Sequence, residues 1–338
     1  MKRLRILALM HPQLVPPDSL EGHTEEEINV WKTEYDVVSH LRAIGHEVRA
    51  LGVQYELLPI RDAVEEWKPH TVFNLLEEFH GEVLFDQNVV SLLELLKVPY
   101  TGCNPRGMII SRGKALSKKL LLYHRIRVPD FAVFPMNRKV KRPPRLGFPL
   151  IVKSLIEHAS VGIAQASVVD SDEKLAERVR FIHERVGTDA IAEQFIEGRE
   201  LYVSVMGNER LVAFPAWELV AEKLAENAPL IATAKVKHDI EYQARHGIDI
   251  RAAELTAEQK AFLAHVSKRI YKILELSGYA RIDFRLGGDG QFYFLEANPN
   301  PEIAEREEFA SAAKAGGVPY PELLQRIINL GLRQRRVE

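Results

Sequence analysis

Four polar side chains near the end of the chain have the types and the spacing of a cation-binding site. Arg281 and Asp283 alternate along one apolar segment, which a Gly-Gly-Asp-Gly turn at 287–290 then closes. Glu296 and Asn298 alternate along the next apolar segment, so the pattern predicts a β-hairpin with all four side chains on one face. Carboxylate and amide oxygens suit a hard cation such as Mg²⁺, which keeps phosphate oxygens and waters as its other ligands. A hairpin edge with solvated charges is the alternative interpretation.

A lysine at the end of a strand-like segment gives a second candidate, a phosphate-binding loop. The segment 148–154 is compact and apolar, it carries Lys153 near its end, and a run with small residues follows it. Small residues let backbone N–H groups approach phosphate oxygens, and the lysine adds positive charge. The glycine spacing and the Gly-Lys-Ser/Thr ending of a Walker loop are absent. Taken alone, the pattern also fits an ordinary surface lysine.

The segment 192–200, Ala-Glu-Gln-Phe-Ile-Glu-Gly-Arg-Glu, gives a third candidate. It places Glu193 and Glu200 on either side of a short apolar stretch and a turn. Two acidic residues with this spacing can bracket an adenine and its ribose hydroxyls. A plain strand and turn is the alternative interpretation.

Together, the three candidates resemble the ATP-grasp superfamily, and most closely its D-alanine–D-alanine ligase branch. The shared order is a lysine strand, a flexible loop, Glu-x-Phe-Ile-x-Gly-x-Glu, Arg-Ile-Asp and Leu-Glu-Ala-Asn. Phe73-Asn74 and the Pro-Tyr-Thr-Gly at 99–102 are similar to that branch's N-terminal domain. The resemblance covers about residues 70–330.

The resemblance implies that two groups of residues bind ATP. Lysines and a flexible covering loop would contact the phosphates: Lys114, Lys153 and the loop from Glu157 to Ser160. The third candidate segment would hold the nucleoside, with Glu193 at the adenine amino group, the backbone of Gln194 and Ile196 at the ring edge, and Glu200 at the ribose.

The resemblance also implies a metal site and catalytic residues. One or two Mg²⁺ ions, with Mn²⁺ as an alternative, would bind to Asp283, Glu296 and Asn298. Catalytic roles would fall on Arg281, on Ser160 of the covering loop and on Lys237. Arg281 would stabilise charge on an acyl phosphate and on the tetrahedral intermediate. Lys237 would touch the γ-phosphate from a lid, and Lys235 is the competing choice for that position.

These roles describe an ATP-dependent carboxylate–amine ligase that forms an amide or peptide bond and releases ADP and phosphate. A carboxylate attacks the γ-phosphoryl group to form an acyl phosphate, from which an amine displaces phosphate. Because water destroys an acyl phosphate, we expect a lid to close over the site. Two alternatives use the same scaffold: an ATP-dependent small-molecule kinase and a non-catalytic ATP-binding regulatory protein.

Both substrate-binding segments differ from the D-alanine–D-alanine ligase pattern. That branch has a glycine-rich turn and an acidic segment after its first strand, whereas His11-Pro12-Gln13 follows here. It also has Pro-Gly with nearby threonine and serine after Leu-Glu-Ala-Asn, whereas 300–308 is Asn-Pro-Glu-Ile-Ala-Glu-Arg-Glu-Glu. We therefore expect a product other than D-alanyl-D-alanine. The glutamates favour either a basic, amine-rich acceptor or a solvated helix start stabilised by the helix dipole.

The elements that position these residues begin with alternating strands and helices. Strand-like segments lie at 4–10, 47–51 and 71–76, and helix-like segments at 25–44, 61–67 and 86–96. This alternation predicts a parallel sheet with helical crossovers. The fold class expected is α/β and α+β, with three units and ATP between the last two. The units are a Rossmann-like N-terminal domain at 1–105, a central ATP-grasp subdomain at 106–198 and a C-terminal ATP-grasp subdomain at 199–338. The central unit begins with a linker helix at 111–123, and the C-terminal unit carries a polar lid segment at 218–249.

Composition sets the remaining expectations. The chain has 338 residues, 46% of them apolar, a formal net charge of −2 and one cysteine, Cys103. One cysteine excludes an internal disulfide framework and a cysteine-based zinc cluster. The small net charge gives no sign of a nucleic-acid partner, and charged residues interrupt every apolar run before the roughly 18–20 residues of a membrane span. We expect a cytoplasmic protein with small-molecule or peptide substrates, and the family resemblance adds a homodimer.

Overall fold

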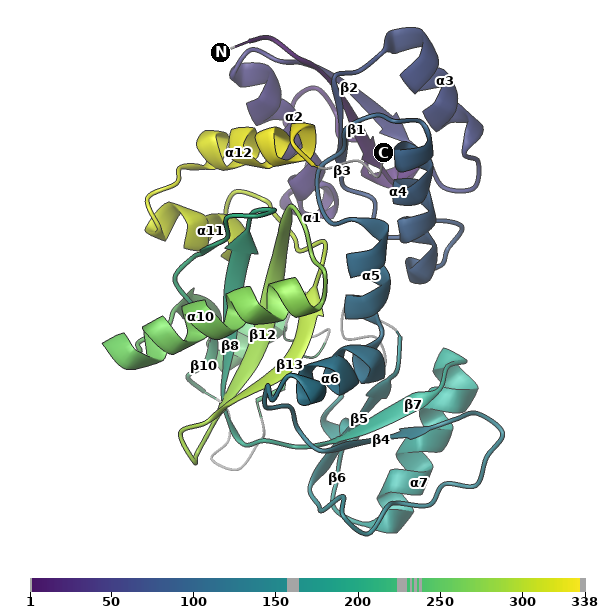
Figure 1. Cartoon of the computed structure of the whole chain (residues 1–338), viewed down its shortest axis with the longest axis vertical. Helices are drawn as coiled ribbons and strands as arrows, with labels where there is room; N and C mark the ends of the chain where they lie inside the picture. Colours follow the sequence, from purple (N-terminus) through teal and green to yellow (C-terminus); the bar gives the residue numbers. More distant parts are fainter. Residues whose placement is uncertain are drawn as a thin grey trace.

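A computed structural model of the chain describes residues 2–156, 164–223, 230–231, 233, 236 and 239–334. Its strands form three sheets. Figure 1 shows the N-terminal sheet at the top, the C-terminal sheet in the middle and the central sheet at the bottom. The N-terminal sheet is parallel, as the alternation of strands and helices predicts, and the other two sheets are antiparallel.

The N-terminal sheet has the order β2-β1-β3. Its strands are β1 (Arg5–Met10), β2 (Glu47–Gly52) and β3 (Thr71–Asn74), and its helical crossovers include α2 (Lys32–Ala43), α3 (Leu58–Trp67) and α4 (Asp86–Leu95). Strand β1 is buried from Ile6 to Met10 because it lies between its two partners and is covered on both faces.

Two predicted helices are each divided in the structure. The segment 25–44 forms α1 (Glu25–Val30) and α2, with the break at Trp31, whose indole packs between His23 and Tyr35. The predicted helix 111–123 is α6 (Lys114–Tyr123), and a separate helix, α5 (Pro105–Arg112), precedes it. Helix α5 starts at the expected domain boundary, where Asn104 caps it and Pro105 fits its first position.

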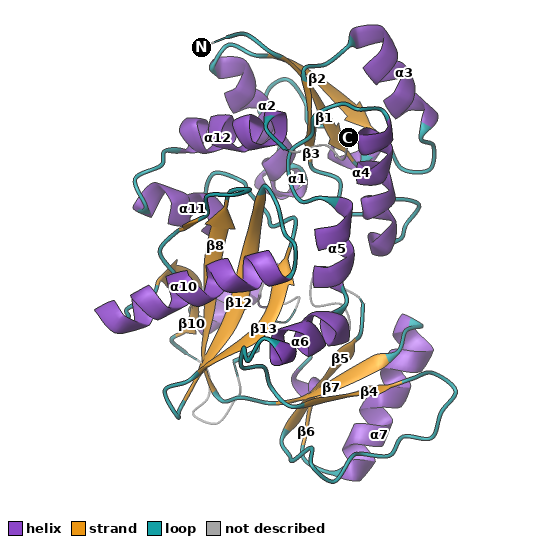
Figure 2. Ribbon diagram, viewed as in Figure 1, coloured by secondary structure: helices purple, strands orange, loops and turns teal. Residues whose placement is uncertain are grey.

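The central sheet has the order β4-β7-β5-β6. Its strands are β4 (Phe131–Phe134), β5 (Leu150–Ser154), β6 (Val168–Val169) and β7 (Ala190–Gln194), and helix α7 (Asp172–Phe181) covers one face (Figure 2). The predicted lysine strand is therefore β5, and the start of the adenine segment is β7, its direct neighbour.

The C-terminal sheet has the order β11-β10-β8-β12-β13, and β9 pairs with β8. Its strands are β8 (Gly198–Met206), β9 (Val212–Ala213), β10 (Trp217–Ala221), β11 (Ile248–Ala252), β12 (Tyr279–Gly287) and β13 (Phe292–Asn298). Helix α10 (Ala257–Ile273) covers one face. Within the described ranges, no helix is both long enough and apolar enough to cross a membrane.

The predicted polar lid segment at 218–249 contains more regular structure than expected. Strand β10 occupies its start, helix α9 (Ile240–His246) lies near its end, and β11 begins at Ile248. Leu219 of β10 is buried, and Trp217 pairs with Tyr202 of β8, so tertiary packing stabilises strands that the weak periodicity did not indicate.

The last helices return the chain to the N-terminal sheet. Helix α11 (Glu308–Ala315) packs on the C-terminal sheet, and α12 (Tyr320–Leu332) packs on α2 and β3. One apolar cluster accordingly joins the two regions through Phe73 of β3, Tyr279 of β12 and Phe309 of α11.

A pair of glycines lets the N-terminal domain approach the C-terminal sheet closely. Gly278 has a φ of +68°, and a Cβ placed on it would lie 2.4 Å from the carbonyl oxygen of Gly102. Beside this contact, the Asn104 N–H donates to Ser277 Oγ at 2.9 Å. The junction therefore depends on a residue without a side chain at 278.

We expect Gly278→Ala to lower the free energy of unfolding by about 2–4 kcal/mol, because left-handed backbone strain and an overpacked contact add. Gly22 is the matched control, since its φ is +86° and nothing lies within 4 Å of an added Cβ. Gly22→Ala should cost only about 1 kcal/mol. Denaturant unfolding measures both changes, and equal losses would contradict the close contact at Gly278.

Candidate functional site

The predicted hairpin of polar side chains is formed by β12 and β13. Arg281 lies opposite Asn298, and Asp283 lies opposite Glu296, so the four residues share one face as the alternation predicts. Directly opposed residues have Cβ atoms about 4.5–5.5 Å apart. The hairpin places two carboxylates and one amide at one end of the sheet.

Arg281 is held between two carboxylates in the interior. Its Nε donates to Asp283 Oδ1 at 2.8 Å, its Nη2 donates to Asp283 Oδ2 at 3.0 Å, and Nη1 pairs with Glu308. The guanidinium also lies 4.8 Å from the centre of the Tyr202 ring. Burial lowers the pKa of Arg281, but the two carboxylates outweigh it and raise the pKa well above its ordinary value. Arg281 therefore stays charged.

Three lysines form a cluster, called here the lysine cluster: Lys114 and Lys118 of α6, which are buried, and Lys153 of β5, which is half-buried. Glu193 of β7, 1% exposed, lies among them, with Oε1 3.0 Å from Lys118 Nζ and Oε2 3.3 Å from Lys153 Nζ. Burial raises the pKa of Glu193, but Lys118 and Lys153 lower it below its ordinary value. The cluster holds three cations around one carboxylate, which suits an anion.

The lysine cluster adjoins the hairpin. Lys118 Nζ, besides its ion pair, donates to the carbonyl oxygen of Leu295 in β13 and lies over the Phe294 ring. Glu296, the next residue, raises the pKa of all three lysines. At Lys114, burial outweighs this effect and lowers the pKa to about 8. Groups suited to phosphate and groups suited to a cation therefore meet at β13.

Glu193 retains an acceptor that suits an adenine amino group. Its Oε1 is buried and makes no aligned hydrogen bond, although it is ion-paired with Lys118. The Gln194 N–H donates to Asp130 O at 2.7 Å, so a contact from Gln194 to the ring edge would use its carbonyl group. Ile196 follows β7 in the connection to β8, two residues beyond Gln194. These groups fit the predicted nucleoside site.

Glu200, predicted to hold a ribose, is buried on β8. It accepts hydrogen bonds from Arg285 Nη2 at 2.8 Å and from the Tyr202 hydroxyl at 3.1 Å. Since the Tyr202 ring also lies against Arg281, these side chains connect the predicted ribose position with the hairpin. Four other predicted residues lie outside the described residues: Glu157, Ser160, Lys235 and Lys237.

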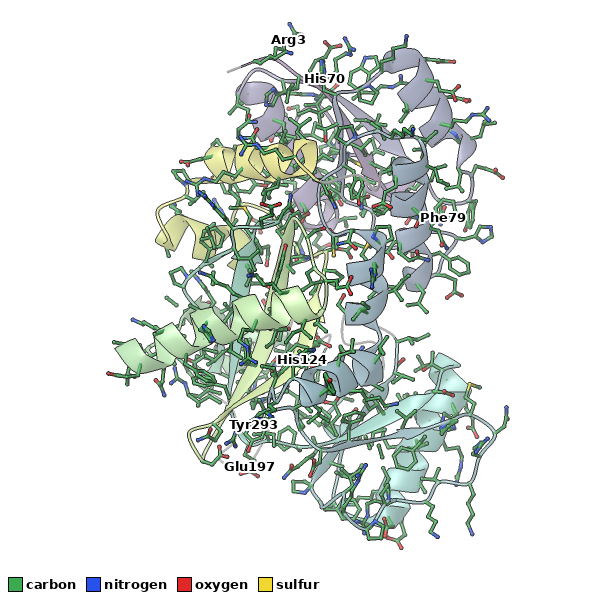
Figure 3. All side chains as sticks on the ribbon, viewed as in Figure 1. Arg3, His70, Phe79, His124, Glu197 and Tyr293 are labelled. Carbon is green, nitrogen blue, oxygen red and sulfur yellow. The ribbon has the colours of Figure 1, made fainter. Side chains whose placement is uncertain are left out.

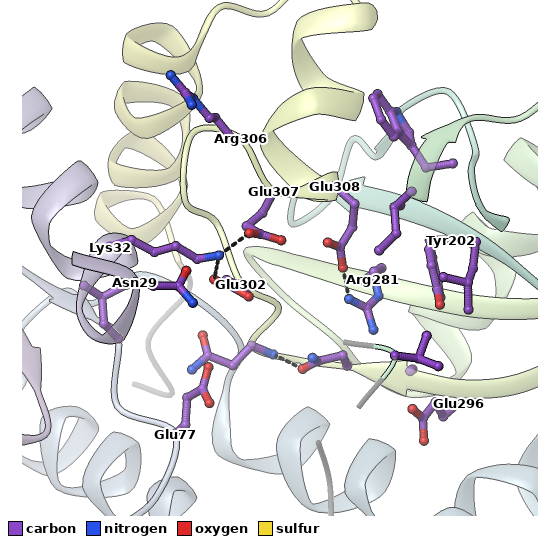
Figure 4. A pocket seen from close by; sticks show the side chains of 18 of the residues that line it. Asn29, Lys32, Glu77, Tyr202, Arg281, Glu296, Glu302, Arg306, Glu307 and Glu308 are labelled. Carbon is purple, nitrogen blue, oxygen red and sulfur yellow. Dashed lines mark hydrogen bonds and ion pairs between the residues drawn. The ribbon is translucent and has the colours of Figure 1, made fainter. Parts of the chain in front are cut away.

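The hairpin opens onto a cavity of about 810 Å³ that reaches the N-terminal domain (Figure 4). Arg281, Glu296 and Asn298 line one end, and His11 and Glu78 line the N-terminal side. This volume is typical of small-molecule sites. Substrates can therefore reach the polar face of the hairpin.

A metal on the hairpin would need ligands from outside the protein. In the described part of the chain, no three His, Cys, Asp or Glu side chains are arranged to hold an ion. The hairpin supplies only Asp283, Glu296 and the Asn298 amide. Such a donor set fits Mg²⁺, which commonly completes its shell with phosphate oxygens and water.

Two residues of this site were not predicted from the sequence. Lys118 lies four positions after Lys114 in α6 and so shares its face, a local signal that was available. Glu308 was treated only as part of an acidic segment, whereas it pairs with Arg281. No local pattern indicates this pair, because 27 positions separate the two residues.

Comparison with known proteins points to one family. Residues 121–329 match the family model described as D-ala D-ala ligase C-terminus. A D-alanine–D-alanine ligase of Aquifex aeolicus is 31% identical over 90% of this chain and 96% of its own length. An uncharacterised protein of Sinorhizobium fredii, y4sG, is 29% identical over 88% of this chain and 87% of its own.

Solved structures show the same fold. The D-alanine–D-alanine ligase from Bacillus anthracis, complexed with ATP, has a TM-score of 0.74 and 25% identity, and 98% of each chain is covered. The VanG D-Ala:D-Ser ligase from Enterococcus faecalis has a TM-score of 0.72 at 19% identity, over 98% of this chain and all of its own. These likenesses confirm the ATP-grasp fold predicted from the sequence.

We expect Glu193→Gln to lower the free energy of unfolding by about 3–5 kcal/mol, because it leaves buried lysines without their counter-charge. Glu197→Gln is the control, since Glu197 is exposed (Figure 3) and its change should stay within about 0.5 kcal/mol. Denaturant unfolding at pH 7 measures both. A stable Glu193→Gln protein would show that the lysine cluster does not depend on this carboxylate.

Proposed function

This chain belongs to the D-alanine–D-alanine ligase family, and we propose that it is an ATP- and Mg²⁺-dependent ligase that joins a carboxylate to an amine. The products besides the amide are ADP and phosphate. The ATP-complexed relative from Bacillus anthracis supports a nucleotide at the corresponding place in this fold.

One observation carries the proposal: the lysine cluster adjoins the carboxylates of the hairpin. Lys118 contacts the backbone of β13 one residue before Glu296. Phosphoryl transfer needs positioning and charge neutralisation more than a protein nucleophile. A magnesium-bound triphosphate requires both kinds of group side by side, and this site supplies both.

Each group then has a role. Lys114 and Lys153 would neutralise phosphate oxygens. Glu193 would accept a hydrogen bond from the adenine amino group, and its ion pairs hold Lys118 and Lys153 in place. Asp283, Glu296 and Asn298 would hold Mg²⁺, which neutralises charge on the phosphates and orients them.

Arg281 supplies the charge needed in the acyl-transfer step. It lines the cavity, it is fixed by Asp283 and Glu308, and its raised pKa keeps it cationic. A fixed cation stabilises the oxyanion that forms when an amine attacks the acyl phosphate. A protein that only binds ATP has no need of this group.

The substrate end supports a product other than D-alanyl-D-alanine. His11 follows β1 and faces Glu78 at 3.7 Å, and carboxylates of the segment 302–308 line the cavity. We expect both substrates to be small molecules or peptides of the cytoplasm, where ATP is available. The homodimer stays a prediction.

The first test is phosphate release from Mg-ATP across a matrix of acids and amines, with ADP and AMP measured separately. We expect ADP and phosphate only when a particular acid–amine pair is present, and no AMP. Glu296→Gln should lower the rate at least about 100-fold, since it removes charge at the developing transition state.

Other outcomes identify the alternatives. A phosphorylated acid or alcohol that accumulates without an amine would indicate a kinase. Tight ATP binding without turnover on any pair would indicate a regulatory protein. Wild-type turnover by Glu296→Gln would remove this residue from the metal site.

Lys114 gives a pH prediction. Its ammonium group is charged below its pKa of about 8 and neutral above it. Since phosphate binds the charged form, the affinity for Mg-ADP should fall by up to about tenfold per pH unit above 8.

Calorimetry from pH 7 to 9.5 checks this prediction. Lys114→Met should bind more weakly at pH 7 and lose the pH dependence near 8. Lys153→Met is the comparison variant, because the pKa of Lys153 is raised. It should bind weakly but keep a pH dependence, displaced to higher pH because Lys153 lowers the pKa of Lys114. A flat wild-type profile would place Lys114 away from phosphate.

A further inference from the structure

The cavity beside the hairpin has one strongly acidic side, called here the acidic wall: Glu77, Glu302, Glu307 and Glu308. Glu77 follows β3, Glu302 and Glu307 lie between β13 and α11, and Glu308 begins α11. Figure 4 shows these side chains around one space, with Lys32 reaching in from α2. The wall is thus built from both the N-terminal and the C-terminal domains.

The charges that line the cavity are unbalanced. Among the described lining residues, seven are aspartate or glutamate and four are lysine or arginine. The buried cations already have carboxylate partners, since Arg281 pairs with Asp283 and Glu308, and Arg112 pairs with Asp86. At Arg281, whose Nε and both Nη atoms already donate to protein carboxylates, a substrate carboxylate would have to compete with Asp283 or Glu308.

Lys32 is also already paired with carboxylates, in this case those of the acidic wall. Its Nζ pairs with Glu307 and lies 3.4 Å from Glu302 Oε1. Arg306, the remaining basic lining residue, is exposed and points away from the wall (Figure 4). The wall therefore lacks a cation that is available to hold a carboxylate, as far as the described residues go.

Glu77 is the wall carboxylate that is not in an ion pair with a described residue. It lines the cavity with an exposed side chain. Desolvation by neighbouring protein atoms, and then Glu302, raise the pKa of Glu77 to about 7, although the positive charge of Arg112 acts to lower it. An ammonium or guanidinium group placed here would pair with Glu77 and offset the repulsion from Glu302.

We propose that the amine substrate of this ligase is at least doubly cationic and has no carboxylate at the wall, as in a diamine, a polyamine or an amide of a basic amino acid. One nitrogen attacks the acyl group, and the second, charged nitrogen binds to Glu77 and Glu302. The inference rests on the proposed function in one respect, namely that this cavity is where the amine substrate binds. The negative charge of the acidic wall then favours a positively charged ligand.

Three ligands with the same butylene chain test the charge preference: 1,4-diaminobutane, pentylamine and 5-aminopentanoate. They place an ammonium, a methyl or a carboxylate at the far end of the same chain. Calorimetry on the full chain with Mg-ADP should give an affinity at least about tenfold higher for the diamine than for pentylamine, and the lowest affinity for 5-aminopentanoate. A titration of Mg-ADP without protein corrects for diamine bound to nucleotide.

Two variants assign the effect to the wall. Glu302→Gln should lower diamine affinity about tenfold and leave pentylamine affinity unchanged. Glu305→Gln is the matched control, because Glu305 lies in the same segment, is exposed and does not line the cavity. It should leave both affinities unchanged.

Each other outcome overturns the inference. Equal or tighter binding of 5-aminopentanoate would show that the wall accepts a carboxylate, and absence of diamine binding would show that it holds no cation. An unchanged diamine affinity in Glu302→Gln would place the diamine elsewhere. None of these results touches the ligase proposal, which fails only if no acid–amine pair releases phosphate from Mg-ATP.

Discussion

The site depends on one buried ammonium group. Lys118, 1% exposed, joins helix α6 to two sheets, through Glu193 of β7 and the Leu295 carbonyl of β13. A buried charge is costly unless it is paired and hydrogen-bonded, so these contacts must form together. Their formation fixes the strand that carries Lys153 relative to the hairpin that carries Glu296. An interaction in the interior therefore sets the distance between the groups that we propose to bind phosphate and those that we propose to bind a metal.

A second set of charges joins the acidic segment to the N-terminal domain. Helix α2 contacts this segment through Lys32, through Thr33, whose hydroxyl lies 3.2 Å from Glu302, and through Asp36, which accepts from the Glu305 N–H at 2.9 Å. The residues that give the cavity its charge thus also connect helix α2 to the segment that follows β13. This double use explains why a glutamate-rich segment, which would repel itself in isolation, is ordered.

Local pattern predicted the parts of the molecule that local chemistry decides. Alternation along 281–283 and 296–298 gave the hairpin, and alternating strands and helices gave the parallel sheet, because strand faces and crossovers follow from sequence spacing. The break at Trp31 and the pair of Arg281 with Glu308 were not predicted, since packing partners from distant segments decide both. The strands on either side of the expected lid were missed for the same reason, as β10 is stabilised by β8.

The return of α12 to the N-terminal sheet has a consequence for synthesis of the chain. Leu323, Leu324 and Ile327 complete the same apolar cluster as Ile6 and Phe73, and Gln325 hydrogen-bonds to His46 at 2.9 Å. One face of the N-terminal sheet, which α2 covers in part, therefore stays incompletely covered until residues 320–332 have been made. At roughly 5–20 residues per second, that interval is on the order of ten seconds to a minute. The N-terminal sheet is thus translated well before its packing is complete, and a chaperone that shields β1 and β3 would act during this interval.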